Sequence, residues 1–189
     1  MLQETDRIRD ASLMAKVAEG DRLAQRQIVD RHLSSIYGVA WRMLKNAASA
    51  EDVCQDAFLR LWQIAARWRP EAKVGTWLYR VAYNLSIDEL RRQNRWSDDE
   101  APDLPDPGAD VLAQHHASDI AIAVETALAK LPIRQRTAIT LVHHQELSNI
   151  EAAEIMQISV EAIESLLARG RRKLRDLLAD RRGELMETL

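Results

Sequence analysis

Cysteine, helix-breaking residues and, in its second half, aromatic residues are scarce in this chain of 189 residues. The single cysteine, Cys54, has no partner for a disulfide within the chain and cannot build a zinc site from cysteines. Six glycines and five prolines favour an all-α fold over sheets with many tight turns. No apolar run approaches the roughly 20 residues of a membrane span, and residues 1–7 lack the apolar core of a signal peptide. We therefore expect a soluble, cytoplasmic protein.

Charge and aromatic residues divide the chain unevenly. The net charge is +4 for residues 1–95, −6 for residues 96–118 and −1 for residues 119–189. All five tryptophans, all three tyrosines and the only phenylalanine lie at or before Trp96. Two segments with different core chemistry and an acidic seam between them predict two small helical domains.

We place these domains at residues 9–96 and 119–182, with residues 97–118 as an acidic, flexible linker that carries three prolines and six carboxylates. Ser49 is the predicted N-cap of a helix that begins at Ala50, and Gly75 is a predicted helix breaker. Apolar periodicity predicts helices over about 9–18, 21–44, 50–66 and from 77 in the first domain, and from 119, over 134–144, up to 156 and over 160–179 in the second.

The segment at residues 77–92 holds the most functional information. At about 100° per residue, one stripe of this helix carries Trp77, Arg80, Asn84, Asp88 and Arg91. Its flanks are largely apolar, so we expect a mostly buried helix with one functional edge. An aromatic ring can stack on a base, an arginine can hold a phosphate, and an amide can read a base edge.

A purely structural interpretation of this stripe also exists. A tryptophan at helical spacing is often a core residue, and Asp88 with Arg91 forms an ordinary i,i+3 ion pair. The rest of the chain decides between the two interpretations.

Residues 148–174 have the proportions of a helix-turn-helix, with a short helix, a three-residue turn and a second helix that can lie in a major groove. Ser148 and Glu151 form a predicted capping box. A basic run at residues 169–175 follows, which suits phosphate binding but also the helix dipole or a solvated face. An ordinary helical hairpin is the alternative for this segment alone.

The ordered motifs resemble those of extracytoplasmic-function sigma factors of the sigma-70 family. The family pattern Ala-Glu-Asp-hydrophobic-x-Gln-(Asp/Glu)-x-Phe is matched at residues 50–58, and a Trp-Leu-Tyr-Arg-x-Ala-x-Asn-x-x-x-Asp-x-x-Arg-Arg run is matched without a gap at residues 77–92. A Leu-Pro-x-x-Gln-Arg pattern opens the second domain at residues 131–136. The resemblance implies a sigma-2-like helical bundle and a sigma-4-like helix-turn-helix domain.

It also implies partners: the core RNA polymerase, through the clamp helices of its largest subunit and the beta flap, promoter DNA, and an anti-sigma factor. The polymerase-docking helix of the family corresponds here to a helix with acids and large apolar groups on one face, which suits a basic, partly apolar partner. The docking residues expected on it are Asp52, Gln55, Asp56, Leu59 and Trp62. Leu59 and Trp62 could instead be core residues.

In the family, the loop before the stripe helix takes up a base flipped from the minus-ten element, at a cost of a few kcal/mol. The resemblance implies that Asn84 lies near that pocket, that Arg80 and Lys73 hold backbone phosphate, and that Arg91 and Arg92 lie near the upstream duplex. The expected minus-ten residues are Arg69, Lys73, Trp77, Arg80, Asn84, Arg91 and Arg92.

The chain departs from the family pattern where the minus-35 element is read. Two usual cations are replaced by Glu164 and Leu166, and Gln157 replaces the glycine common at the turn, which predicts a less tightly left-handed turn. A glutamate can accept from the N4 amino group of cytosine. The expected minus-35 residues are Glu161, Glu164, Ser165, Arg169, Arg171 and Arg172.

No metal or cofactor site is expected, because the histidine pairs at 115–116 and 143–144 project in different directions and lack cysteine partners. No acid, base and nucleophile occur at a recognisable spacing, so the chain is not expected to be an enzyme. The function expected is that of a sigma factor that directs core polymerase to promoters, controlled by an anti-sigma factor. The alternative is a decoy that sequesters an anti-sigma factor without initiating transcription.

Overall fold

The computed structural model describes the backbone of residues 2–69, 73–96 and 119–187. The chain divides into two compact units, and the boundary in the sequence lies between Trp96 and Ser97. Every regular element in the described ranges is a helix, which confirms the all-α prediction. The predicted linker lies outside the described residues.

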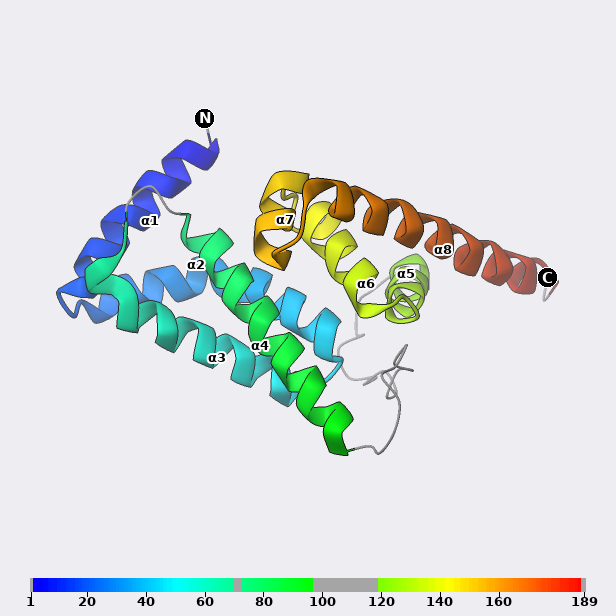
Figure 1. The fold of residues 1–189 in the computed structure, drawn as a ribbon, viewed down its shortest axis with the longest axis horizontal. Coiled ribbons are helices and arrows are strands. Elements are labelled where there is room, and N and C mark those ends of the chain that lie inside the picture. The colour runs from blue at the N-terminus through cyan, green and yellow to red at the C-terminus, as the bar shows by residue number, and fades with distance from the viewer. Residues whose placement is uncertain (1, 70–72, 97–118, 188–189) are drawn as a thin grey trace. The chain divides into compact units, whose positions relative to one another are not determined.

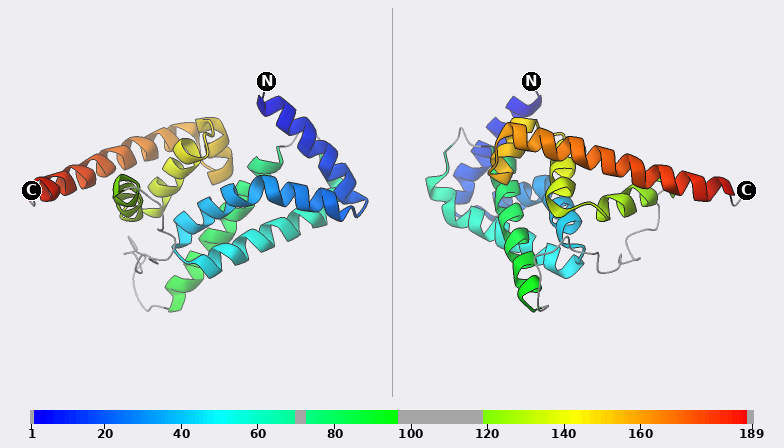
Figure 2. Two further views of the ribbon diagram at one scale, coloured as in Figure 1. Left: turned by 180° about the vertical axis from the view of Figure 1, so that it is seen from behind. Right: turned by 45° about the vertical axis from the view of Figure 1, so that its right-hand side comes forward.

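The first unit is a bundle built around one long helix (Figure 1). This helix, α2, packs against the other three long helices of the unit, and α3 also packs against α4 (Figure 2). A single 3₁₀ turn, η1, follows α3 and contacts α1. The elements are α1 (Leu2–Ala18), α2 (Arg22–Leu44), α3 (Ala47–Ile64), η1 (Ala65–Arg67) and α4 (Val74–Trp96).

Large aliphatic side chains from all four long helices fill the core of this bundle. Burial of each such side chain contributes about 1.5–3 kcal/mol relative to its exposure. The largest of these, all below 2% exposed, are Met14, Ile28, Ile36, Val39, Leu61, Val74 and Leu78.

The connection between α2 and α3 differs from the sequence prediction. Lys45 ends α2 in the left-handed region, at φ 52°, and Asn46 at once caps α3. The Asn46 side chain accepts a hydrogen bond from the Ser49 backbone N–H at 2.9 Å. The prediction of Ser49 as the cap was therefore wrong, because Asn46 is an equally good capping residue placed three positions earlier, where it allows one more turn of helix.

Three other boundaries were also misplaced. Gly75 is the second residue of α4 rather than a breaker. The backbone N–H of Trp77 donates to the Lys73 carbonyl at 3.1 Å, so the helical hydrogen bonds already span this glycine. At the chain ends, α1 begins at Leu2 rather than near Arg9, and α8 continues to Glu187 rather than ending near Ala179.

Residues 119–187, the described part of the second unit, form four α-helices and one short π-helical segment. The last and longest helix, α8, packs against α5, α6 and α7. Leu128, Leu141, Ile155 and Ile163 are fully buried in this unit. The elements are α5 (Asp119–Ala129), α6 (Ile133–Ile139), η3 (Thr140–His144), α7 (Asn149–Met156) and α8 (Val160–Glu187).

A glycine allows α6 and α8 to approach closely. Gly170 is buried in the middle of α8, and a Cβ added to it would lie 2.7 Å from Cδ1 of Ile139 on α6. Such a distance is shorter than a normal carbon–carbon contact. A larger residue at this position would displace the end of the Ile139 side chain, so the glycine permits this close packing of Ile139 against α8.

The helices α7 and α8 each begin at a capping residue. Ser148 and Glu151 form the predicted capping box, and the Ser159 hydroxyl accepts from the Ala162 N–H at 3.2 Å. Gln157 lies in the left-handed region, at φ 54° and ψ 46°, so the expectation of a less left-handed turn was wrong. The Ile158 N–H donates to the Ala153 carbonyl at 3.1 Å, and bonds of this kind offset the cost of about 1–2 kcal/mol for a non-glycine residue there.

A buried carboxylate joins α1 to α2. Asp10 is 5% exposed and accepts hydrogen bonds from Nε of Arg31 at 2.9 Å and Nε2 of His32 at 2.8 Å. Burial raises the pKa of Asp10, but the hydrogen bond from His32 and the attraction of His32 and Arg31 outweigh it and hold this pKa below its ordinary value. A lowered pKa in the folded state stabilises the fold above the ordinary pKa, and this contribution is lost as the pH falls.

We expect Asp10→Asn to lower the free energy of unfolding at pH 7 by about 1.5–3 kcal/mol, since bonds to a charged group are lost. The difference from the wild type should shrink as the pH falls below about 3.9, the ordinary pKa of an aspartate, because the unfolded chain binds the proton first and the folded carboxyl binds it only at its lower pKa. Urea unfolding from pH 7 to pH 3 measures this difference in the free energy of unfolding, with Asp30→Asn on the exposed face of α2 as the control. A difference that stays constant down to pH 3 would contradict the assigned role.

Candidate functional site

The stripe on α4 forms an exposed edge on a partly buried helix, so the expectation of a mostly buried helix was wrong. Arg80, Asn84, Asp88 and Arg91 are exposed, while Trp77 is half-buried. On the flanks, Leu78, Tyr79, Ala82 and Tyr83 are all buried. The apolar flanks therefore fix the rotation of α4, and the polar edge faces solvent as the sequence pattern indicates.

Trp77 contacts a second tryptophan at the beginning of this edge. Its ring lies 6.2 Å from that of Trp68, between centroids, with an interplanar angle of 81°. The edge-to-face arrangement is a favourable one for aromatic rings. Trp68 is held by its backbone N–H, which donates to the Ala65 carbonyl at 3.1 Å at the end of η1. Sequence reasoning gave Trp68 no role, although the spacing of aromatic residues around the loop was a usable signal.

Cationic residues lie near this pair of tryptophans in the sequence. Arg69 and Lys73 are exposed on either side of residues 70–72, which lie outside the described residues. Arg80 follows Trp77 by three residues and Asn84 follows Arg80 by four, so they occupy successive turns of one helix face. The structure thus brings an aromatic ring, a guanidinium and an amide together along one edge.

The last part of the edge is occupied by ion pairs within α4. Arg91 lies 3.6 Å from Asp88, and Arg92 forms an ion pair with Glu89. The hydrogen bond from Arg92 holds the pKa of Glu89 below its ordinary value. Exposed pairs of this kind contribute at most about 1 kcal/mol. A phosphate can therefore replace either carboxylate at small cost.

The predicted docking face of α3 combines acids with an exposed leucine. Asp52 and Gln55 are exposed, and Leu59 is 50% exposed, so Leu59 is not a core residue. Asp56 accepts two hydrogen bonds from Arg60, at 3.2 and 2.9 Å. Trp62 is half-buried, with its ring 6.0 Å from that of Phe58. These side chains leave an apolar spot bordered by carboxylates.

The opposite face of α3 is buried and contains the only cysteine. Cys54 is buried, and burial together with the nearby charge of Glu51 raises the pKa of its thiol to about 11. The thiol is therefore protonated and shielded at neutral pH, so it is a poor nucleophile or metal ligand. This residue is part of the core.

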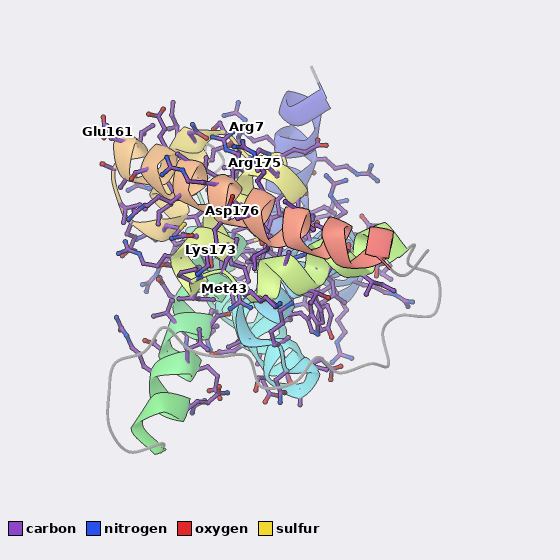
Figure 3. The ribbon with its side chains drawn as sticks, turned by 90° about the vertical axis from the view of Figure 1, so that its right-hand side faces the viewer. Arg7, Met43, Glu161, Lys173, Arg175 and Asp176 are labelled. Carbon is purple, nitrogen blue, oxygen red and sulfur yellow. The ribbon has the colours of Figure 1, made fainter. Side chains whose placement is uncertain are left out.

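The predicted minus-35 residues all lie exposed on α8, and Figure 3 labels Glu161 near the start of this helix and Lys173 and Arg175 further along it. The departure at Leu166 has a packing reason, because this side chain is only 8% exposed and belongs to the core. Acidic residues occupy the first turns of the helix and cations the later ones. The exposed predicted residues are Glu161, Glu164, Ser165, Arg169, Arg171 and Arg172.

The two glutamates differ in their surroundings. A backbone hydrogen bond at the helix start and a hydrogen bond from Ser159 lower the pKa of Glu161, so this carboxylate takes part in capping. Glu164 lies one turn further along the helix, beside Ser165, and is exposed. Arg169 and Arg171 donate through Nε to carbonyls of their own helix, both at 3.3 Å.

Metal binding and membrane insertion find no support in the described part of the chain. His143 and His144 are exposed, and no three potential ligands gather in residues 2–69, 73–96 and 119–187. The pair at 115–116 lies outside these ranges. None of the helices searched in the same part of the chain is both long and apolar enough to cross a bilayer.

Comparisons with known proteins identify the family of the chain. The model of the family "Sigma-70 region 2" matches residues 28–96, and that of "Sigma-70, region 4" matches residues 121–174. The chain is 34% identical to the ECF RNA polymerase sigma factor SigW of Bacillus subtilis over 176 residues, which cover 87% of this chain and 94% of SigW. It is 34% identical to SigM of Mycobacterium tuberculosis over 169 residues, which cover 89% of this chain and 84% of SigM.

Among solved structures, CnrH in complex with the cytosolic domain of CnrY is similar to this chain, with a TM-score of 0.67 and 27% identity. The alignment covers 91% of this chain and 98% of CnrH. Both helical units therefore have counterparts, in the same order along the chain, in sigma factors. The chain belongs to the extracytoplasmic-function (ECF) group of the sigma-70 family of RNA polymerase sigma factors.

Proposed function

We propose that this sigma factor directs core RNA polymerase to its promoters through three surfaces, one each on α3, α4 and α8. The observation that carries the proposal is the exposed edge of α4, where Arg80 and Asn84 follow Trp77 on successive turns above a buried flank. A helix needed only for packing gains nothing from this combination. A strand with exposed bases offers a partner to each of the three groups.

The α3 face is the proposed contact with the clamp helices of the polymerase. A half-exposed leucine beside a half-buried tryptophan, with polar groups around them, suits an interface that has an apolar centre and a polar rim, and the neighbouring carboxylates suit a basic partner. Leu59 is the central apolar group and Trp62 the larger, half-buried one. The surrounding polar groups are Asp52, Gln55 and Asp56.

The α4 edge is the proposed site for the minus-ten strand. Arg69, Lys73 and Arg80 supply positive charge for the backbone, and Asn84 can donate to and accept from a base edge. Trp77, braced by Trp68, forms a wall beside the captured base. Arg91 and Arg92 face the upstream duplex, where phosphates replace Asp88 and Glu89 as their partners.

The α8 helix is the proposed reader of the minus-35 duplex. Arg169, Arg171 and Arg172 neutralise phosphates, and Ser165 contacts a base or the backbone. Glu161 is already engaged at the helix start, so Glu164 is the carboxylate better placed to accept from a cytosine N4 amino group. The beta flap of the polymerase is the proposed protein partner of the second unit.

An anti-sigma factor is the proposed regulator. CnrH, whose chain aligns almost throughout with this one, was solved with a bound protein, the cytosolic domain of CnrY. Because this chain would act on core polymerase, we propose that it acts in the cytoplasm. The proposal requires no cofactor and no enzymatic step by this chain.

Transcription by the reconstituted holoenzyme tests the function directly. The purified protein, added to core polymerase with a genomic promoter library, is expected to give discrete run-off transcripts that core polymerase alone does not give. No transcript from any template, together with tight binding of an anti-sigma factor, would instead identify a decoy.

Substitution of the α4 edge should separate promoter opening from polymerase binding. We expect Arg80→Ala and Asn84→Ala each to slow opening by about tenfold or more, because a charged or base-edge hydrogen bond is lost. Permanganate reactivity of unpaired thymines measures opening, and a competition assay measures affinity for core polymerase. Arg26→Ala, an exposed cation on α2, is the control and should behave as the wild type. Equal opening by all four proteins would refute the assignment of the edge.

Base preference at the minus-35 element tests Glu164. With a library randomised there, Glu164→Ala is expected to lose a preference for cytosine at one position, with a change of about 1–3 kcal/mol in discrimination. Glu154→Ala, another exposed carboxylate of the helix-turn-helix, should leave the preference intact. An unchanged preference at every position would show that Glu164 reads no base.

A further inference from the structure

His32 lies where three helices of the first unit meet. From α2, its Nε2 atom lies 2.8 Å from Oδ2 of Asp10 on α1. The other edge of the ring faces α4, where a Cβ built on Gly75 would lie 3.6 Å from both Cε1 and Nδ1. The His32 side chain is 17% exposed and that of Asp10 is 7% exposed. The imidazole is thus bonded to one helix and packed against the first turn of another.

Two hydrogen bonds fix the orientation of this ring. An ionised carboxylate can only accept, so Nε2 of His32 donates. The other carboxylate oxygen of Asp10 accepts from Nε of Arg31 at 2.9 Å, which prevents the carboxylate from turning away. The hydrogen bond to Asp10 on α1 therefore restrains the His32 ring, and the ring edge that faces Gly75 cannot rotate freely.

The turn that this edge meets is the one that begins the α4 stripe. Val74, next to Gly75, is 1% exposed, and the Lys73 carbonyl accepts the Trp77 N–H at 3.1 Å. The next turn of α4 is tied to α2 by a hydrogen bond between Tyr79 and Ser35. In the first turn of α4, the nearest side chain to Gly75 is that of His32 on α2.

We propose that His32, oriented by Asp10, is a positioning residue that holds the first turn of α4, and with it Trp77 and Arg80, in the geometry that captures the minus-ten strand. The inference rests on the function proposed above. It assigns to the junction of α1, α2 and α4 a role in promoter opening, although His32 itself contacts no DNA. Loosening of this junction should leave the α3 docking face unchanged, since none of its residues takes part.

The conservative pair His32→Gln and His32→Asn tests the hydrogen bond to Asp10. Glutamine places an amide N–H near the position of Nε2, whereas asparagine is too short to reach it. His32→Leu removes the donor at similar size, and Leu33→Ala, an exposed neighbour on α2, is the control. Arg26→Ala, which replaces an exposed cation on α2, is a second control.

Each full-length variant is bound to core polymerase and examined on a promoter that the wild type transcribes. Three quantities are measured: affinity for core polymerase, the rate of opening by permanganate reactivity, and affinity of the holoenzyme for a single-stranded oligonucleotide with the non-template minus-ten sequence. We expect His32→Leu and His32→Asn to lower the last two by about tenfold, the size expected for a lost bond to a charged group, with core affinity unchanged. His32→Gln and both controls should remain close to the wild type.

Three results would overturn the inference. Normal opening by His32→Leu and His32→Asn would show that the ring does not position the stripe. Equal loss in His32→Gln and His32→Asn, or a loss of core affinity in parallel with opening, would show a general structural role. If His32→Leu does not fold, the Gln and Asn variants decide the matter. Failure of the wild type to open any promoter would instead refute the proposed function itself.

Discussion

The first unit depends on the burial of one face of α2. This helix packs against α1, α3 and α4, and its buried residues lie at the spacing of a single helical face. Because each large aliphatic group in that face contributes about 1.5–3 kcal/mol, the rotation of α2 is fixed, and the helices that pack on it are fixed in turn. The two exposed surfaces of the unit, on α3 and α4, are what remains outside after that burial.

The α4 edge shows how packing and chemistry divide one helix. Leu78 and Ala82 are fully buried, which leaves Arg80 and Asn84 in solvent on the other side. At the start of the helix the arrangement is tighter, since Trp77 contacts Trp68 and Gly75 lies beside His32. The part of the edge that must shape a pocket is held by contacts with other elements, while the later part carries only exposed ion pairs.

In the second unit, one face of α8 packs against α5, α6 and α7, while other faces of the same helix expose cations to solvent. Gly170 and Leu166 face inward, against α6 and the core, while the arginines around them face outward. The burial of Leu166 explains why this chain has no cation at position 166, because a charged group there would be buried. Glu164 has no such explanation in packing, which is why its exposed carboxylate is the more informative departure from the family pattern.

The sequence by itself determined the helical class, most helix boundaries, the capping box at Ser148 and the amphipathic stripe of α4, because apolar periodicity and capping chemistry are local properties. It misplaced the start of α3, where Asn46 and Ser49 are both good caps, and it misjudged Gly75 and Gln157. At these positions hydrogen bonds and neighbours outweigh local preference: helical bonds span Gly75, and backbone bonds hold Gln157 in the left-handed region. The junction of Asp10, His32 and Gly75 was decided only by the tertiary structure, since its members are distant in sequence and meet only when separate helices pack. The two residues Trp68 and Trp77 are close in sequence, but the edge-to-face geometry of their rings depends on how η1 and α4 are placed.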